Sequence, residues 1–176
     1  MKKKTLLKIT GIGLLGYGLL ALIGSTLVSP VYTVSSEITL PANPELSWEV
    51  LTKFENYPEW NPYLTRVEGK LAPGETVSFT LIDGNFTDPM HLSAVVALVQ
   101  PPKQFYWTGT LVLQGIHDTR HIFELKPRPD GTTQLLHYEE FRGVLPMLLP
   151  EREQRTAHTR RAFEGMNRAL QQRLGK

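Results

Sequence analysis

Residues 38–69 read ITLPANPELSWEVLTKFENYPEWNPYLTRVEG and carry the clearest structural signals in the chain. An alternating segment is followed by Pro41-Ala42-Asn43-Pro44, which marks the start of a helix. The Asn43 side chain can cap the first turn, and Pro44 suits the first helical position because its missing N–H has no partner there. We therefore predict a helix over 44–54, a second short helical turn over 57–62, and then a strand.

The rest of the chain beyond residue 30 predicts an antiparallel sheet closed by one long helix. Alternating β-branched and apolar residues, divided by turn-forming clusters, mark seven strands. From residue 151 to 174 the apolar residues recur at helical spacing instead, and Phe163, Met166 and Leu170 should face the sheet. The arginines on the other faces of this helix alternate with acids, so we expect solvated surface rather than an anion-binding stripe. The predicted strands span 31–40, 64–71, 75–82, 90–99, 104–113, 119–125 and 132–142.

These motifs resemble the START-like (SRPBCC) superfamily, in the branch named for polyketide cyclases/dehydrases and lipid transport. The opening run is joined by Trp107-Thr108-Gly109, by His121-Ile122-Phe123-Glu124-Leu125 and Gly131-Thr132-Thr133, and by Glu139-Glu140-Phe141-Arg142-Gly143. The resemblance covers about residues 33–174. It implies an α+β helix-grip fold, in which a curved antiparallel sheet wraps around a long C-terminal helix and a hydrophobic cavity lies between them. It implies binding rather than a named reaction.

A leader with a long uncharged run precedes this domain. Four lysines come before Ile9–Val28, a run of uncharged residues long enough to cross about 30 Å of hydrocarbon as a helix. We predict a transmembrane anchor over 1–30 and a helix-grip domain over 31–176. The lysines place the N-terminus in the cytoplasm and the domain on the other side of the membrane. The alternative is a cleaved signal peptide and a secreted domain, although Gly24-Ser25-Thr26 is a poor cleavage site.

Composition excludes several classes of function. The chain has 176 residues with 19 Lys and Arg against 17 Asp and Glu, and four of the lysines lie in the leader. The predicted domain therefore has no basic footprint for nucleic acid. Cysteine is absent, which excludes disulfides, thiol nucleophiles and Cys-ligated zinc. His117 and His121 share one strand face but lie about 13 Å apart, too far to bind one metal ion. We expect no metal and no cofactor.

Several residues are candidates for the wall of a cavity. Alternation places Trp107 and Leu111 on one strand face with Leu113, and the resemblance places Trp60 in a turn near the cavity mouth. His121 shares a face with apolar residues and so needs a polar partner, for which Glu139 or Glu140 on the next strand is the candidate. The same residues would equally serve a packed core. The predicted ligand-binding set is Trp60, Tyr63, Phe79, Trp107, Leu111, His121, Glu140 and Phe163.

Three functions follow from this sequence, in order of preference. The first is a membrane-anchored protein that binds an apolar or amphipathic small molecule, including a lipid, with one or two polar groups that orient it. The second is a cyclase-like or hydratase-like enzyme that uses His121 with Glu139 or Glu140 as an acid/base pair. The third is an interaction or assembly factor with a filled core, which a cavity of several hundred Å³ would exclude.

Overall fold

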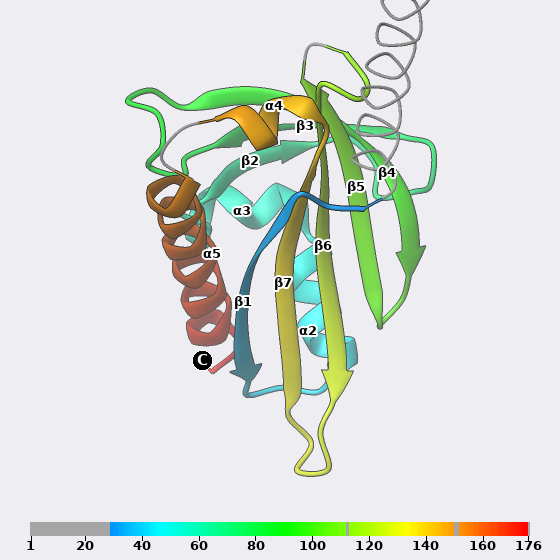
Figure 1. The fold of residues 1–176 in the computed structure, drawn as a ribbon. Coiled ribbons are helices and arrows are strands. Elements are labelled where there is room, and N and C mark those ends of the chain that lie inside the picture. The colour runs from blue at the N-terminus through cyan, green and yellow to red at the C-terminus, as the bar shows by residue number, and fades with distance from the viewer. Residues whose placement is uncertain (1–28, 112, 150–151, 176) are drawn as a thin grey trace, which may run out of the picture.

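The computed structural model describes residues 29–111, 113–149 and 152–175. Seven antiparallel strands form one curled sheet in the order β1-β7-β6-β5-β4-β3-β2 (Figure 1). Consecutive strands from β2 to β7 are neighbours, as predicted for a meander, while β1 pairs with β7 at the far edge. The strands are β1 (Tyr32–Leu40), β2 (Leu64–Glu68), β3 (Thr76–Leu81), β4 (Met90–Gln100), β5 (Gln104–Leu111), β6 (His117–Pro127) and β7 (Thr133–Arg142).

Three short helical segments connect the two edges of the sheet. They are α2 (Pro44–Thr52), the 3-10 turn η1 (Phe54–Asn56) and α3 (Tyr57–Trp60). The predicted cap is present, since Asn43 Oδ1 accepts a hydrogen bond from the Leu46 N–H at 2.9 Å. Helix α2 ends two residues earlier than predicted because the backbone leaves helical geometry at Lys53, with ψ at 76°.

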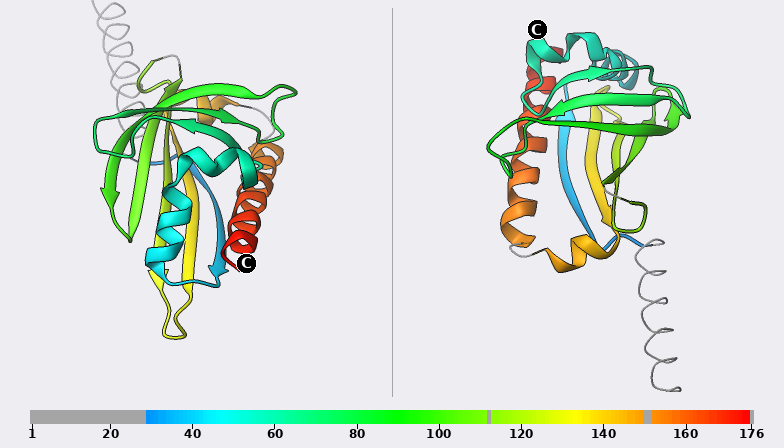
Figure 2. Two further views of the ribbon diagram at one scale, coloured as in Figure 1. Left: turned by 180° about the vertical axis from the view of Figure 1, so that it is seen from behind. Right: turned by 90° about the horizontal axis from the view of Figure 1, so that it is seen from above.

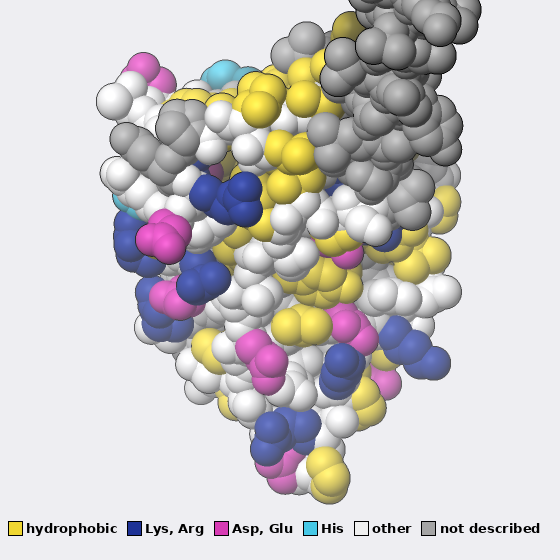
Figure 3. Space-filling model, in the orientation of Figure 1, with side chains coloured by type: hydrophobic (Ala, Val, Ile, Leu, Met, Phe, Trp, Pro, Cys, Tyr) yellow, Lys and Arg dark blue, Asp and Glu magenta, His cyan; other side chains and the backbone are white. Residues whose placement is uncertain are grey.

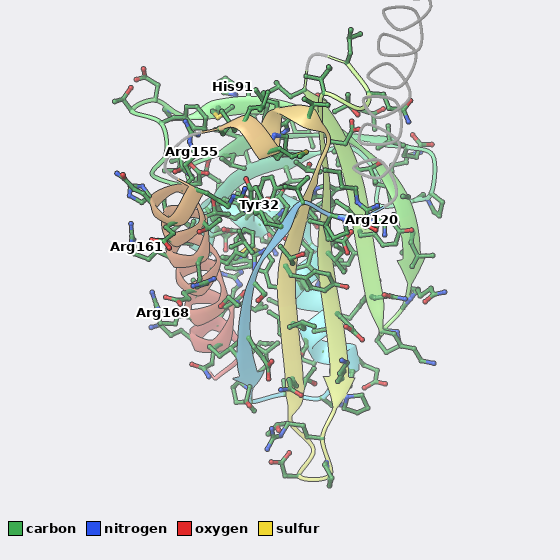
Figure 4. The ribbon with its side chains drawn as sticks, in the orientation of Figure 1. Tyr32, His91, Arg120, Arg155, Arg161 and Arg168 are labelled. Carbon is green, nitrogen blue, oxygen red and sulfur yellow. The ribbon has the colours of Figure 1, made fainter. Side chains whose placement is uncertain are left out.

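Helix α5 (Arg152–Leu174) lies along β1 and completes the helix-grip arrangement that the sequence predicts. Figure 2 shows α2 and α5 on the same, concave side of the sheet. The predicted inward stripe is confirmed, because Phe163, Met166 and Leu170 are fully buried. Arg161 and Arg168 extend outward from this helix, as expected for solvated surface (Figure 4).

A further helix, α4 (Val144–Leu148), occupies a segment for which only a turn was predicted. Gly143 precedes it with φ at 97°, a conformation that favours glycine. A Cβ atom at Gly143 would lie 2.6 Å from the Ile116 carbonyl oxygen, so the close packing of the two segments also requires glycine. Pro146 is tolerated within this helix because it lies in the first turn, where the N–H groups have no helical partner.

The turn between β5 and β6 differs from the prediction. Strand β5 ends at Leu111 rather than residue 113, and β6 begins at His117 rather than residue 119. The Asp118 carboxylate closes the turn by accepting a hydrogen bond from the Gly115 N–H at 2.6 Å. Leu113 therefore lies outside the strand and is 67% exposed, so its predicted place on the Trp107 face is wrong.

Aromatic side chains fill the half of the interior beneath α2. Phe105 stacks on Phe123 with ring centroids 4.8 Å apart, and Trp48 of α2 meets Phe105 edge-on at 5.5 Å. Phe54 joins the same cluster through Trp107. None of the helices in the described part of the chain is both long and apolar enough to cross a bilayer. The predicted anchor over 1–30 falls almost wholly outside the described residues.

Candidate functional site

A cavity of about 180 Å³ lies beside the aromatic cluster beneath α2 and opens to the surface. It lies between the concave face of the sheet and the first turns of α5, and the loop between β3 and β4 forms part of its wall. Apolar side chains supply most of this wall. They include Val34, Phe79, Leu81, Leu92, Ala94, Trp107, Phe141 and Leu149.

The structure brings together five of the eight residues predicted to contact a ligand. Those that line the cavity are Tyr63, Phe79, Trp107, Leu111 and His121.

The other three predicted residues lie elsewhere. Trp60 packs edge-on against Tyr57 in α3, and Phe163 is fully buried against His137, with ring centroids 4.0 Å apart. Glu140 lies on the opposite face of β7, because neighbouring residues of a strand point to opposite sides of the sheet. There it accepts a hydrogen bond from Arg142 at 2.5 Å. The cavity-facing acid is its neighbour Glu139.

A chain of polar side chains runs from the cavity to α5. Glu139 is the cross-strand neighbour of His121, with 3.7 Å between Glu139 Oε2 and His121 Nδ1. On its other side, His121 Nε2 lies 2.8 Å from Nε2 of His137. His137 Nδ1 lies 2.9 Å from Asn167 Oδ1, and the Asn167 amide donates to the Ser36 hydroxyl at 3.1 Å. Of the two acids that the sequence offered as partners for His121, the structure selects Glu139.

The protons in this chain follow from its geometry. Because the Asn167 amide nitrogen donates to Ser36, its oxygen faces His137, and His137 Nδ1 must carry a hydrogen. Burial holds the pKa of His137 well below its usual range, and the nearby His121 lowers it further. His137 is therefore neutral, its Nε2 accepts, and His121 Nε2 donates. A second proton on His121 would sit on Nδ1, facing Glu139.

Tyr63 provides a third polar group on the cavity wall. Its ring is stacked on His121, with centroids 6.0 Å apart and an angle of 18° between the planes. Burial raises the pKa of Tyr63 well above its usual value, and the charges of Glu139 and Asp83 raise it further, so the phenol keeps its proton. Its hydroxyl makes no hydrogen bond to any residue in the described ranges. It is available to a ligand or to water.

The loop between β3 and β4 is tied to α5 beside the cavity. The Asn85 amide donates to Asp83 Oδ2 at 2.8 Å and to Thr159 Oγ1 at 3.1 Å. His158 of the same helix lies 2.6 Å from the Gly84 carbonyl oxygen. Asp83, Asn85 and Thr159 all line the cavity. These contacts fix the position of a loop that the sequence showed only as a turn.

His117 and Arg155 are two further polar residues of the wall. Burial lowers the pKa of His117, against the opposing effect of Glu139. Arg155 was expected on the solvated face of α5, and His137 was not among the predicted site residues. The alternation of β7 does carry a signal for His137, which shares a face with Leu135 and Glu139. Within the described ranges, no cluster of His, Asp and Glu side chains is placed to hold a metal ion.

Several solved structures are similar to this one. An aromatase/cyclase from Streptomyces sp. R1128 has 20% identity and a TM-score of 0.64, covering 82% of this chain and 93% of its own. A START superfamily protein from Mycobacterium smegmatis has 19% identity and a TM-score of 0.62, covering 81% and 97%. A protein from Mesorhizobium loti has 24% identity and a TM-score of 0.61, covering 82% and 97%. At these identities the likeness shows the fold.

Sequence comparison gives the family. No curated protein matches this chain. The model of the family described as polyketide cyclase / dehydrase and lipid transport matches residues 32–176, from the first strand through the C-terminal helix. The match confirms the resemblance found in the opening run and in the later strands. The chain belongs to the polyketide cyclase/dehydrase and lipid transport family.

Proposed function

We propose that this protein binds an apolar or amphipathic small molecule in its cavity. The observation that carries the proposal is the composition of the cavity wall. Apolar strand faces form most of it, and Glu139, His121 and Tyr63 are neighbouring polar groups on it. Burial of apolar ligand surface supplies about 25 cal/mol per Å² before entropic costs, and the polar groups orient the ligand.

The cavity volume limits the size of the enclosed part of the ligand. A dry cavity of about 150 Å³ accepts benzene, whereas pockets for drug-sized ligands have about 300–1,000 Å³. The 180 Å³ found here suits a one-ring or two-ring group, or the end of a chain that leaves through the mouth. This volume is below the several hundred Å³ that would exclude an assembly factor. The Tyr63 hydroxyl favours a ligand, because polar groups inside a filled core are normally hydrogen-bonded and this one has no partner among the described residues.

We infer that the domain is held at a membrane by residues 1–30. The support is the sequence alone: four lysines followed by the uncharged run Ile9–Val28. The N-terminus then lies in the cytoplasm and the cavity on the other side of the membrane. A lipid is one ligand of the required chemistry.

A fluorescent probe tests the binding proposal directly. N-phenyl-1-naphthylamine, whose naphthyl group has the two-ring size that the cavity can enclose, should quench the tryptophan emission saturably and at one site, because Trp107 lies on the cavity wall. Ala94 is buried on the cavity wall, so Ala94→Leu should fill the space and weaken probe binding at least tenfold with little loss of stability. Val95→Leu is the matched control, because Val95 is exposed on the other face of β4. Unsaturable quenching, or equal binding by both variants, would contradict the proposal.

An enzyme in the same cavity is the second candidate. The observation that favours it is the His121–Glu139 pair on the cavity wall beside Tyr63, because such a pair can transfer a proton to and from a bound molecule. Glu139→Gln separates the two functions. A binding protein should retain probe binding and change its selectivity among ligands with hydroxyl or carbonyl groups. An enzyme should retain binding and lose turnover of a substrate from that class.

A further inference from the structure

Exposed apolar side chains gather around the mouth of the cavity. Of the eight large hydrophobic residues that are exposed in the described ranges, five line the cavity or belong to the β5–β6 turn and helix α4, which adjoin residues of its wall. Phe86 and Leu111 belong to the cavity wall itself. Figure 3 shows hydrophobic side chains gathered at the end of the molecule that carries α4. The five residues, called here the apolar rim, are Phe86, Leu111, Leu113, Ile116 and Leu148, with exposures of 52%, 45%, 67%, 38% and 72%.

Backbone hydrogen bonds hold the parts of the apolar rim in place. The Val144 N–H donates to the Gly115 carbonyl at 3.1 Å, and the Leu145 N–H donates to the Ile116 carbonyl at 2.8 Å. The turn between β5 and β6 and helix α4 are thus fixed side by side. Leu113 and Leu148 therefore belong to segments whose backbones are fixed. Their side chains are nevertheless exposed and contribute little to the packing of the domain.

The described chain begins at this same end of the molecule. The Val31 N–H donates to the Phe141 carbonyl at 2.7 Å, and Tyr32, stacked on Phe141, lines the cavity. The uncharged run Ile9–Val28 ends only three residues earlier, a span of at most about 10 Å. A membrane that holds this uncharged run therefore lies close to the apolar rim.

The charges beside the mouth suit an anionic surface. Arg155 lines the cavity, and the Arg152 guanidinium lies over the Tyr32 ring at 5.6 Å. The nearby carboxylates each have a partner within the domain. Asp118 accepts from the Gly115 N–H and the Thr110 hydroxyl, Asp83 accepts from the Asn85 amide, and Glu139 lies beside His121. Two arginines thus flank an apolar surface, the pattern by which proteins bind to the boundary between lipid headgroups and acyl chains.

We propose that the apolar rim docks on the surface of a lipid bilayer, so that the cavity opens into the headgroup region. The ligand then enters from the membrane and does not cross water. This inference rests on the proposed function, because it concerns how the same cavity is reached. The partner of the apolar rim is a lipid surface and not a second copy of the chain.

The absence of cysteine allows a direct test on the full chain. Single cysteines at Leu113 and Leu148 are labelled with nitrobenzoxadiazole, and Asp130→Cys in the β6–β7 turn is the control at the opposite end of the sheet (Figure 1). Each protein is reconstituted in vesicles of phosphatidylcholine and phosphatidylglycerol at 3:1, with and without lipid carrying a 5-doxyl quencher. Labels at 113 and 148 should be quenched at least threefold more than the label at 130.

Equal quenching at all three positions would overturn the proposal. Energy transfer between labels on two copies, without quenching by the lipid, would also overturn it and would assign the apolar rim to a dimer. The double variant Leu113→Asp, Leu148→Asp should reduce quenching of a label at Ile116 to the level seen at position 130. The matched control Val95→Asp, an exposed residue on another surface, should leave it unchanged.

Probe titration in the same vesicles separates this inference from the proposed function. Saturable binding of N-phenyl-1-naphthylamine with unquenched rim labels would mean that the cavity binds ligand and the apolar rim does not touch lipid. Quenched rim labels without saturable probe binding would mean that the apolar rim docks and the cavity has another use.

Discussion

Acid should destabilise this domain through His137. The imidazole is fully buried, and its pKa is held well below the usual range by burial first and by His121 second. The unfolded chain takes up a proton at this position as the pH falls through about 6.5, while the folded protein keeps the ring neutral. Protonation therefore favours the unfolded state. The stability that His137 contributes is complete above pH 6.5 and is lost as the pH falls toward its folded pKa.

The expected loss follows from the linkage relation. One proton bound only by the unfolded chain costs about 1.4 kcal/mol per pH unit below the unfolded pKa. Between pH 7.5 and 5.0 this amounts to about 2 kcal/mol for His137. The pKa of His117 is also lowered, so His117 adds to the loss in the same direction.

Urea denaturation at several pH values, monitored by tryptophan fluorescence, measures how the free energy of unfolding depends on pH. The protein used is a chain that begins at Ser29. His137→Phe keeps an aromatic ring against Phe163 and Phe123 but cannot titrate. At pH 7.5 this variant should be less stable than wild type, because His121 and Asn167 lose a partner. On acidification to pH 5.0 its free energy of unfolding should fall by about 2 kcal/mol less than that of wild type. His91→Gln, which removes an exposed histidine, is the control. Parallel slopes for wild type and His137→Phe would refute the reasoning.

Three further changes test other parts of the structure. Phe163→Ala should cost about 3–5 kcal/mol, because Phe163 is fully buried and is not itself a lining residue of the cavity; an unchanged melting temperature would contradict the packing of α5. Gly143→Ala should cost about 1–3 kcal/mol or more from strain at positive φ, measured by denaturation, whereas Gly131→Ala, also at positive φ but in open space, should cost less. Deleting residues 1–28 should release a folded domain from the membrane fraction, and full-length protein recovered soluble and uncut would contradict the anchor.

The fold could be predicted from the sequence because the signals for its helices and strands are local. The cap at Asn43, the alternation of β5 and β6 and the helical stripe of Phe163, Met166 and Leu170 each depend on neighbours within a few residues. Helix α4 was missed since its position depends on the contact of Gly143 with Ile116, which belongs to tertiary packing.

The candidate site was only partly predictable. Alternation indicated Trp107 and His121, but the choice between Glu139 and Glu140 depends on the register of β6 against β7. The contact of His137 with Asn167 depends on how α5 docks, and nothing near either residue in sequence reports it. The division of the interior into an aromatic core and an open cavity is likewise a result of side-chain packing, which residue types do not determine.

The pairing of β1 with β7 also sets the order in which the chain can fold. Tyr32 is opposite Phe141, more than a hundred residues away, whereas β2 to β7 form hairpins with their immediate neighbours. Local hairpins close quickly, and contacts across long separations wait for the loop between them to be closed. The first strand to leave the ribosome therefore remains unpaired until β7 has been made, and its other edge stays uncovered until α5 follows. Premature termination anywhere before α5 would leave β1 exposed, with a free edge that invites aggregation.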